Sequence, residues 1–463
     1  MLNKKTLSYK KAISICMTAI LLFAIGYMII GTKSHVQYNG KVVFSFYFNI
    51  LFFGMFLLKS MKKYTYSFDL MFWLFSLFFF GLAPLAQYFL YTYSWGVTPN
   101  SDEIILINAF ILFFSFCFCL GKSLSRLKIR YNKQRDTGSV IYVASSNRIK
   151  VLLIITILIT LYHLVFIGFP NLLIASTSEN DQLDSTSSLL LLHGLKNISL
   201  FVWVSCFLDC KRKKHLTISA IIAGVCFLIS CFPTGLSRNM MASFYAGIFL
   251  VVFDKQREKR WITYVIFFGL VLLFPAANVF RNLENFTTGN IWESMLENVQ
   301  KTYVEAHYDA HQMFISIYQY VKKYGVSYGK QLLGALLFFV PRSIWPGKPY
   351  GSGQTVFEAL KQHEFTNVSA PLVAESYINF GILGIALFGT AIGLITTKMD
   401  RAFWREKNRF SPFCVLYPFL ILKFFFMLRG DLMSTWAYTF AQLVVGVFIL
   451  KFVMKKKKVR QNN

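Results

Sequence analysis

Residues 411–453 read SPFCVLYPFLILKFFFMLRGDLMSTWAYTFAQLVVGVFILKFV. Two apolar runs, 411–428 and 432–453, are separated here by only Arg429, Gly430 and Asp431. A helix needs about 20 apolar residues to cross the hydrocarbon core of a bilayer. Each run is close to that length, so the stretch predicts two antiparallel membrane-spanning helices joined by a tight turn.

Similar apolar runs recur along the rest of the 463-residue chain. The sequence is 55% hydrophobic and 15% charged, whereas about 25% of the residues of a soluble domain are charged. This composition excludes a soluble globular domain, and we predict an all-α, polytopic integral membrane protein of about 12 transmembrane helices. The predicted spans lie near 12–31, 42–60, 68–90, 103–121, 149–168, 188–208, 215–232, 236–253, 261–280, 370–397, 411–428 and 432–453.

The net charge of +27 follows the same pattern. Most of the lysines and arginines fall in alternate connections between the predicted spans, including a basic cytoplasmic linker at 122–148, whereas 91–102 and 169–187 contain none. Loops on the cytoplasmic side of a membrane carry such an excess of basic residues. We therefore predict that both termini are cytoplasmic, and the charge no longer argues for nucleic-acid binding.

One connection is much longer than the others. We divide the chain into an N-terminal bundle (1–280), a large extracytoplasmic loop (281–369) and a C-terminal three-helix segment (370–463). Apolar residues recur at helical spacing over 292–321, which predicts an amphipathic helix. Prolines interrupt PRSIWPGKPYGSG at 341–353, which predicts a re-entrant or interfacial stretch.

Basic residues at the outer ends of predicted spans are candidates for anion binding. Ionisable groups in or near the bilayer are costly and often functional, and a guanidinium binds phosphate oxygens in a fork. Snorkelling of long side chains to the interface is the alternative, and it also applies to Lys196 and Lys423 within spans. The candidates for binding a diphosphate are Arg238, Arg281, Arg342, Lys348 and Arg429.

Proton-transfer candidates are fewer. Glu375 lies near the outer end of the tenth predicted span, where the alternative to catalysis is a structural ion pair. The sequence EAHYDAH places His307 and His311 on one helical face, four residues apart. Asp309 lies between them in the sequence and shares another face with Glu305. A single pair of histidines is weak evidence for zinc, so we predict no metal site.

Four motifs of the chain resemble those of the bacterial O-antigen and oligosaccharide repeat-unit polymerases (Wzy type). They are PTGLSRNMM (233–241), PRSIWPGKP (341–349), AESYINFGILG (374–384) and LRGD (428–431). The resemblance implies a membrane glycosyltransferase at the outer face of the bacterial cytoplasmic membrane. It would move a growing O-antigen, capsule or exopolysaccharide chain from its polyprenyl-diphosphate carrier to a new carrier-linked repeat unit, with no cofactor or metal. Membrane lipid, a flippase and a chain-length regulator are candidate partners.

Within this family, we expect the basic residues to hold the donor diphosphate and an acidic or imidazole group to act as general base. Glu375 is the first choice as base, with Asp309, His307 and His311 behind it. Other functions remain open: a glycan ligase using the same carrier, a lipid-linked oligosaccharide flippase or transporter, and a scaffold protein.

Overall fold

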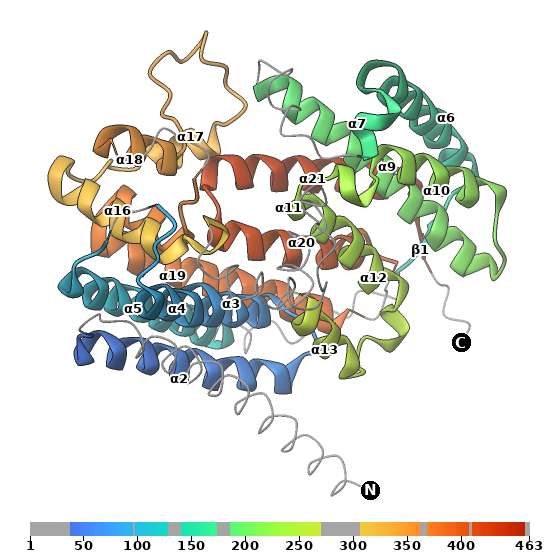
Figure 1. Ribbon diagram of the computed structural model, residues 1–463. Coiled ribbons are helices and arrows are strands. Elements are labelled where there is room, and N and C mark those ends of the chain that lie inside the picture. Colours follow the sequence, from blue (N-terminus) through green and yellow to red (C-terminus); the bar gives the residue numbers. More distant parts are fainter. Residues whose placement is uncertain are drawn as a thin grey trace, which may run out of the picture.

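The computed structural model shows a bundle of helices that run roughly side by side (Figure 1). It describes residues 38–95, 98–127, 140–173, 186–269, 306–361, 368–406 and 410–458, and the structural statements below concern these residues.

Eight helical segments of the described chain are long and apolar enough to cross a membrane. Two of them continue through a wider π-helical turn. The eight are α2 (Gly40–Lys63), α3 (Phe68–Leu77) continuing through a turn at Phe78–Leu82 into α4 (Ala83–Leu90), α5 (Ser101–Leu127), α6 (Ser146–Tyr162) with its extension His163–Ile167, α9 (Thr186–Lys213), α19 (Leu372–Arg405), α20 (Pro412–Arg429) and α21 (Leu432–Val453).

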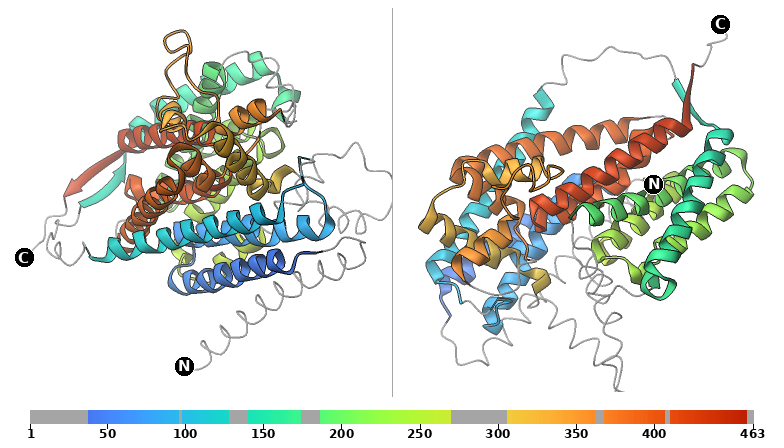
Figure 2. Two further views of the ribbon diagram at one scale, coloured as in Figure 1. Left: turned by 90° about the vertical axis from the view of Figure 1, so that its left-hand side faces the viewer. Right: turned by 90° about the horizontal axis from the view of Figure 1, so that it is seen from above.

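Shorter elements complete the described chain. The apolar helices α10 (Ile218–Ser230), α11 (Arg238–Met241) and α12 (Gly247–Val252) lie on one side of the bundle, with α13 (Trp261–Phe268) after them (Figures 1 and 2). The π-helical turn Ala242–Ala246 joins α11 to α12. The remaining elements are α7 (Phe169–Leu173), α16 (Ala310–Tyr324), α17 (Lys330–Leu336), α18 (Ser352–Leu360), β1 (Val140–Ala144) and β2 (Met454–Lys458).

The two ends of the bundle differ in chemistry. At one end, called the loop end below, α16, α17 and α18 gather at the left of Figure 1. At the other, called the basic end, β1 pairs antiparallel with the lysine-rich β2, Val140 opposite Lys458 (Figure 2). Chain segments far apart in sequence therefore meet at each end.

Glycines allow α5 and α19 to pack backbone against backbone. Gly389 and Gly393 form a G-x-x-x-G pair on α19, a spacing that places both glycines on one face and lets helices approach closely. A side-chain carbon at Gly393 would collide with the carbonyl of Phe118, and one at Gly121 would collide with the carbonyl of Thr390. This contact joins the N-terminal and C-terminal parts of the chain.

The structure confirms an all-α polytopic membrane protein, to which it adds one small two-stranded ribbon. Eight of the predicted spans are present at full length, and 215–232 and 236–253 correspond to shorter apolar helices. The first predicted span, 12–31, lies outside the described residues. Of the predicted span 261–280 the structure describes residues 261–269, most of which form α13, so the count of twelve stays a prediction. Part of the predicted linker at 122–148 is ordered, because α5 continues to Leu127 and β1 forms at Val140–Ala144.

The predicted external segment is described in part. Residues 292–305 of the predicted amphipathic helix lie outside the described residues, and α16 begins at Ala310. Its residues 310–317 are buried and its end at 322–324 is exposed, so the first half of the helix packs into the bundle. The proline-rich loop, 337–351, projects from the bundle beside α17 (Figure 1). Ile344 in this loop is 76% exposed, and the choice between a re-entrant and an interfacial loop stays a prediction.

The close contact of α5 and α19 gives a stability test. Gly393→Ala places a methyl group against a backbone carbonyl, and overpacking of this kind costs about 1–3 kcal/mol. We expect a lower unfolding temperature in detergent for this variant. Gly194→Ala is the matched control, because a methyl group there meets no atom within 4 Å and alanine favours the helix. Equal unfolding temperatures for the two variants would contradict the close packing.

Candidate functional site

The buried carboxylate of Asp309 brings distant parts of the chain together at the loop end. Asp309 is 0% exposed and lies directly before α16. Its Oδ1 forms an ion pair with Nη2 of Arg429 at 3.2 Å and accepts a hydrogen bond from Oγ of Ser369 at 2.6 Å. Its Oδ2 accepts one from Nε1 of Trp95 at 3.2 Å. The carboxylate thereby fixes the position of the guanidinium at the end of α20.

A second arginine joins this ion pair through His307. The Nε of Arg429 donates a hydrogen bond to the carbonyl of His307 at 2.8 Å. The imidazole of His307 contacts the guanidinium of Arg238, at the start of α11, with Nη2 to Nδ1 at 2.9 Å. Arg238, His307, Asp309 and Arg429 form a group that we call the arginine cluster. Four of the predicted site residues therefore lie together.

Two lysines extend the positive charge into the bundle. Lys423 on α20 is 1% exposed and Lys196 on α9 is 4% exposed, so neither side chain snorkels to water. Lys423 donates a hydrogen bond to Oδ1 of Asn239 at 3.3 Å, directly beside Arg238. Lys423 lies six residues before Arg429, so it is about 9 Å further into the bundle along α20 than Arg429 is. Within the described chain, neither lysine forms an ion pair with a carboxylate.

The surroundings of these lysines are rich in polar groups. His193 lies on α9 with its ring 4.3 Å from that of Tyr438, and both lysines are near enough for their charges to act on it. Among the described residues, the Nε2 of His193 and the Nε2 of Gln442 are buried without a hydrogen-bond partner. Unsatisfied buried groups are rare and require an explanation such as a missing ion or water. Sequence reasoning missed His193 and Gln442, although each is a polar residue in an apolar run.

Glu375, near the arginine cluster, has both of its carboxylate oxygens occupied by hydrogen bonds that connect helices. Its Oε2 accepts a hydrogen bond from Oγ of Ser352 at 2.7 Å, and its Oε1 accepts one from the backbone N–H of Leu432 at 2.9 Å. Leu432 is the first residue of α21, whose next N–H groups bond to Asp431. Both oxygens of Glu375 therefore help to anchor α18 and α21 to the start of α19.

Arg342 and Lys348 form hydrogen bonds within the proline-rich loop. Arg342 donates to the carbonyls of Lys348 at 2.5 Å and Pro349 at 3.1 Å, and its guanidinium lies 3.9 Å from the ring centre of Tyr350. Lys348 donates to the carbonyls of Phe338 and Val340, and burial together with the nearby Arg342 lowers its pKa. These two residues hold the loop in shape, and the structure does not bring them into the arginine cluster.

The last two predicted site residues have different outcomes. His311 is buried, with Nε2 3.1 Å from Oδ1 of Asn108, and burial lowers its pKa to about 3. It is therefore a neutral side chain at physiological pH that contacts Asn108 of α5. Arg281 lies outside the described residues. Within the described part of the chain, no three His, Cys, Asp or Glu side chains gather closely enough to hold a metal ion.

Comparison with known proteins gives one finding. A family model described as "O-antigen polysaccharide polymerase Wzy" matches residues 13–458, which is nearly the whole chain. No curated protein and no solved structure matches it.

The burial of His311 predicts an acid-dependent loss of stability. Its pKa is lowered from 6.5 to about 3 on folding, so below pH 6.5 the unfolded chain binds a proton that the folded chain does not. The free energy of unfolding then falls by about 1.4 kcal/mol for each pH unit below that value. We expect His311→Gln to lose less thermal stability between pH 7 and pH 5 than the unmodified protein does.

The exposed His215 provides the control. His215→Gln should keep the full acid dependence. An acid dependence that is unchanged in His311→Gln would show that another group controls it.

Proposed function

Since the chain belongs to the O-antigen polysaccharide polymerase Wzy family, we propose that its arginine cluster binds the diphosphate of a polyprenyl-linked repeat unit. The protein is a repeat-unit polymerase of the inner membrane, a glycosyltransferase that acts on lipid-linked oligosaccharides. The proposal concerns the carrier, the side of the membrane and the residues that perform the reaction.

The gathering of positive charge at the arginine cluster carries the proposal. Arg238, Arg429 and the two buried lysines contribute four cationic groups, and within the described chain Asp309 forms an ion pair with one of them, Arg429. Buried charge without compensation is costly, and several basic groups together favour a multivalent anion. A diphosphate supplies that compensation, and its lipid tail would keep it at the membrane.

The same charges would assist the reaction. As the bond between the anomeric carbon and the phosphate oxygen breaks, the electron pair leaves with the diphosphate. Preorganised donors aimed at this oxygen stabilise the developing charge, and the apolar surroundings strengthen the attraction. The cluster would thus supply the positive charge that a metal ion supplies in other transferases, so the proposed reaction is metal-independent.

The acceptor hydroxyl must lose its proton as it attacks the anomeric carbon. We assign the proton to His307, because its half-buried imidazole lies at the arginine cluster and imidazole accepts protons near neutral pH. Both ring nitrogens of His307 contact Nη2 of Arg238, so a diphosphate that binds this guanidinium would free a ring nitrogen for the proton. Asp309 would act as a positioning residue, because its oxygens already accept from Arg429, Ser369 and Trp95. Glu375 is the alternative base, although Ser352 and Leu432 occupy its oxygens.

The distribution of charge supports an outward-facing site. The basic end carries β2 with its lysines, and the arginine cluster lies toward the opposite, loop end. By the positive-inside rule the basic end is cytoplasmic. The arginine cluster would then face the outer side, where α16, α17 and α18 flank it, and both termini would be cytoplasmic.

The test is polymerisation by the purified protein in proteoliposomes with a polyprenyl-diphosphate-linked repeat unit. We expect Arg238→Ala and Arg429→Ala each to reduce the rate about 100-fold or more, as removal of a transition-state donor does. Arg148→Ala is the control, because Arg148 bonds to the carbonyl of Phe452 at the basic end. Near-normal rates for Arg238→Ala and Arg429→Ala would contradict the proposed diphosphate site.

The same assay separates the two candidate bases. His307→Gln should lose most of the activity together with the acidic limb of the pH–rate profile. Glu375→Gln can still accept from the N–H of Leu432 with its amide oxygen and donate to the hydroxyl of Ser352 with its amide nitrogen, so it should retain a normal profile. The reverse pattern would assign the base to Glu375. A glycan ligase would instead leave single repeat units unjoined.

A further inference from the structure

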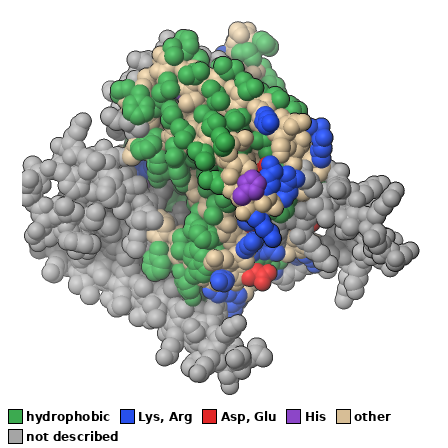
Figure 3. Space-filling view, turned by 90° about the vertical axis from the view of Figure 1, so that its right-hand side faces the viewer, with side chains coloured by type: hydrophobic (Ala, Val, Ile, Leu, Met, Phe, Trp, Pro, Cys, Tyr) green, Lys and Arg blue, Asp and Glu red, His purple; other side chains and the backbone are tan. Residues whose placement is uncertain are grey.

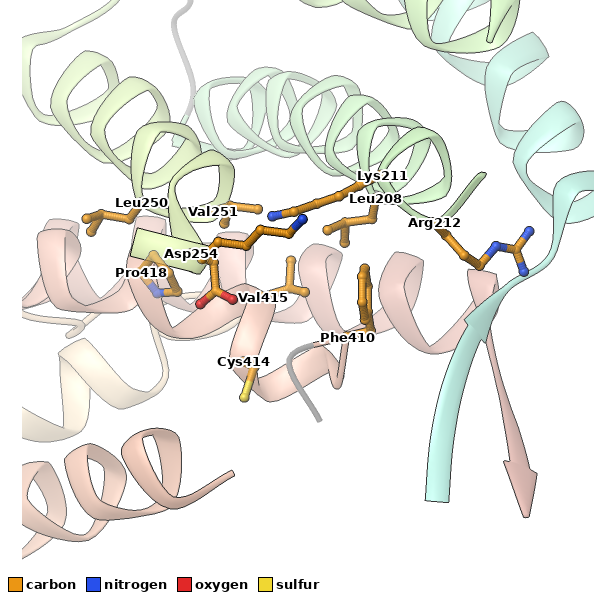
Figure 4. Close-up of a pocket in the computed structure, with 11 residues that line it drawn as sticks. Leu208, Lys211, Arg212, Leu250, Val251, Asp254, Phe410, Cys414, Val415 and Pro418 are labelled. Atoms are coloured by element: carbon orange, nitrogen blue, oxygen red, sulfur yellow. The ribbon is translucent and has the colours of Figure 1, made fainter. Parts of the chain in front are cut away.

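A cavity of about 350 Å³ opens at the basic end, far from the arginine cluster (Figure 4). Its walls come from the last turns of α9, the end of α12 with the turn at Asp254–Gln256, and the first turns of α20. Lys211 reaches from α9 across the cavity toward Val251, with Asp254 on the opposite wall. The sole hydrogen bond of its Nζ within the described chain is a long one, 3.5 Å, to the carbonyl of Val252.

The cavity combines an apolar interior with a basic rim. Leu208, Val251 and Val415 are buried and supply apolar walls. Lys211, Arg212 and Lys255 line the same cavity. A ligand that fits both features has an anionic group attached to a hydrocarbon portion.

The lysines on the rim are the groups best placed to meet an anion. Arg212 is already paired with Asp209 at 2.6 Å. Asp254, the acid in the cavity wall, lies 3.6 Å from Arg257, and burial raises its pKa while Arg257 and Lys211 oppose that rise. Lys255 forms no ion pair with any described carboxylate, and it is exposed. The positive charge of Lys211 and Lys255 thus exceeds what the cavity itself neutralises.

A second, smaller cavity shares part of its wall with the first. It measures about 120 Å³ and has Leu208, Arg212 and Phe410 in common with the larger one. Tyr142 of β1 and Val453 of α21 also line it. The shared wall thus combines apolar side chains with the cationic Arg212.

The surface around the cavities has the same combination. Figure 3 shows Lys and Arg side chains gathered in a band on this face, beside a broad area of hydrophobic side chains. Leu216 and Ile218, in the turn between α9 and α10 and at the start of α10, are 71% and 76% exposed. Such side chains suit the boundary between lipid headgroups and acyl chains, and basic pockets between transmembrane helices bind anionic lipid headgroups.

We propose that this cavity binds an anionic phospholipid of the surrounding leaflet. The phosphate lies between Lys211 and Lys255, and an acyl chain covers Leu208 and Val415. The site is separate from the arginine cluster, and it depends neither on the proposed catalytic roles nor on the direction in which the protein is inserted.

The test is native mass spectrometry of the full chain in detergent, titrated with phosphatidylglycerol or phosphatidylcholine. A basic residue near a membrane surface contributes about fivefold to binding of anionic lipid. The double variant Lys211→Gln/Lys255→Gln should therefore bind phosphatidylglycerol about 30-fold more weakly, with little change for phosphatidylcholine. Lys211→Arg/Lys255→Arg, which keeps both charges, should bind nearly as the unmodified protein does.

The matched control is Lys214→Gln/Lys259→Gln, which removes the same charge from exposed positions outside the cavity. It should bind within about twofold of the unmodified protein. If both double variants bind phosphatidylglycerol equally weakly, the lipid is attracted by surface charge in general, and the proposed site is wrong. Unchanged binding by Lys211→Gln/Lys255→Gln would also contradict the site. Excess inorganic phosphate should not displace the lipid. Displacement would assign the site to a free anion.

Discussion

The ion pair between Asp309 and Arg429 holds the loop end of this protein together. Asp309 is fully buried, and a buried carboxylate is tolerated only when charge and hydrogen bonds compensate it. Arg429, Ser369 and Trp95 supply that compensation from the end of α20, the segment before α19 and the segment after α4. The geometry of the arginine cluster follows from this, because Arg429 also bonds to His307, which contacts Arg238.

Much of the bundle could be predicted from the sequence, because a bilayer fixes the length of an apolar helix. The arginine cluster could be predicted in part: Arg238 and Arg429 are basic residues at the ends of apolar runs. The contacts of Arg342 and Glu375 could not be predicted, because the sequence pattern does not show which groups a side chain meets. Arg342 bonds to its own loop, and Glu375 bonds to Leu432, 57 residues away. The partners of the polar residues Gln312 and His311 on α16 likewise become visible only in the structure.

The two buried lysines show most directly that the gathering of positive charge lowers the stability of the fold. Lys423 and Lys196 are nearly inaccessible to solvent, yet within the described chain they lack a carboxylate partner. Replacement of a buried ion pair by hydrophobic residues of similar size is often stabilising by about 1–4 kcal/mol, and a buried charge that lacks a paired partner costs more to bury than a paired one. Their presence is therefore unfavourable for folding alone. Sites that bind charged substrates commonly reduce stability in this way.

The most direct measurement compares Lys423→Met with the unmodified protein in detergent, by unfolding temperature with and without undecaprenyl diphosphate. If Lys423 binds the diphosphate, the variant should unfold at a higher temperature than the unmodified protein when no ligand is present. It should also lose most of the increase in unfolding temperature that the ligand causes. Lys451→Met, at an exposed position of α21 near the basic end, should change neither value. A ligand-free Lys423→Met that is less stable, together with an unchanged ligand-induced rise, would contradict a role for the buried charge in binding the carrier.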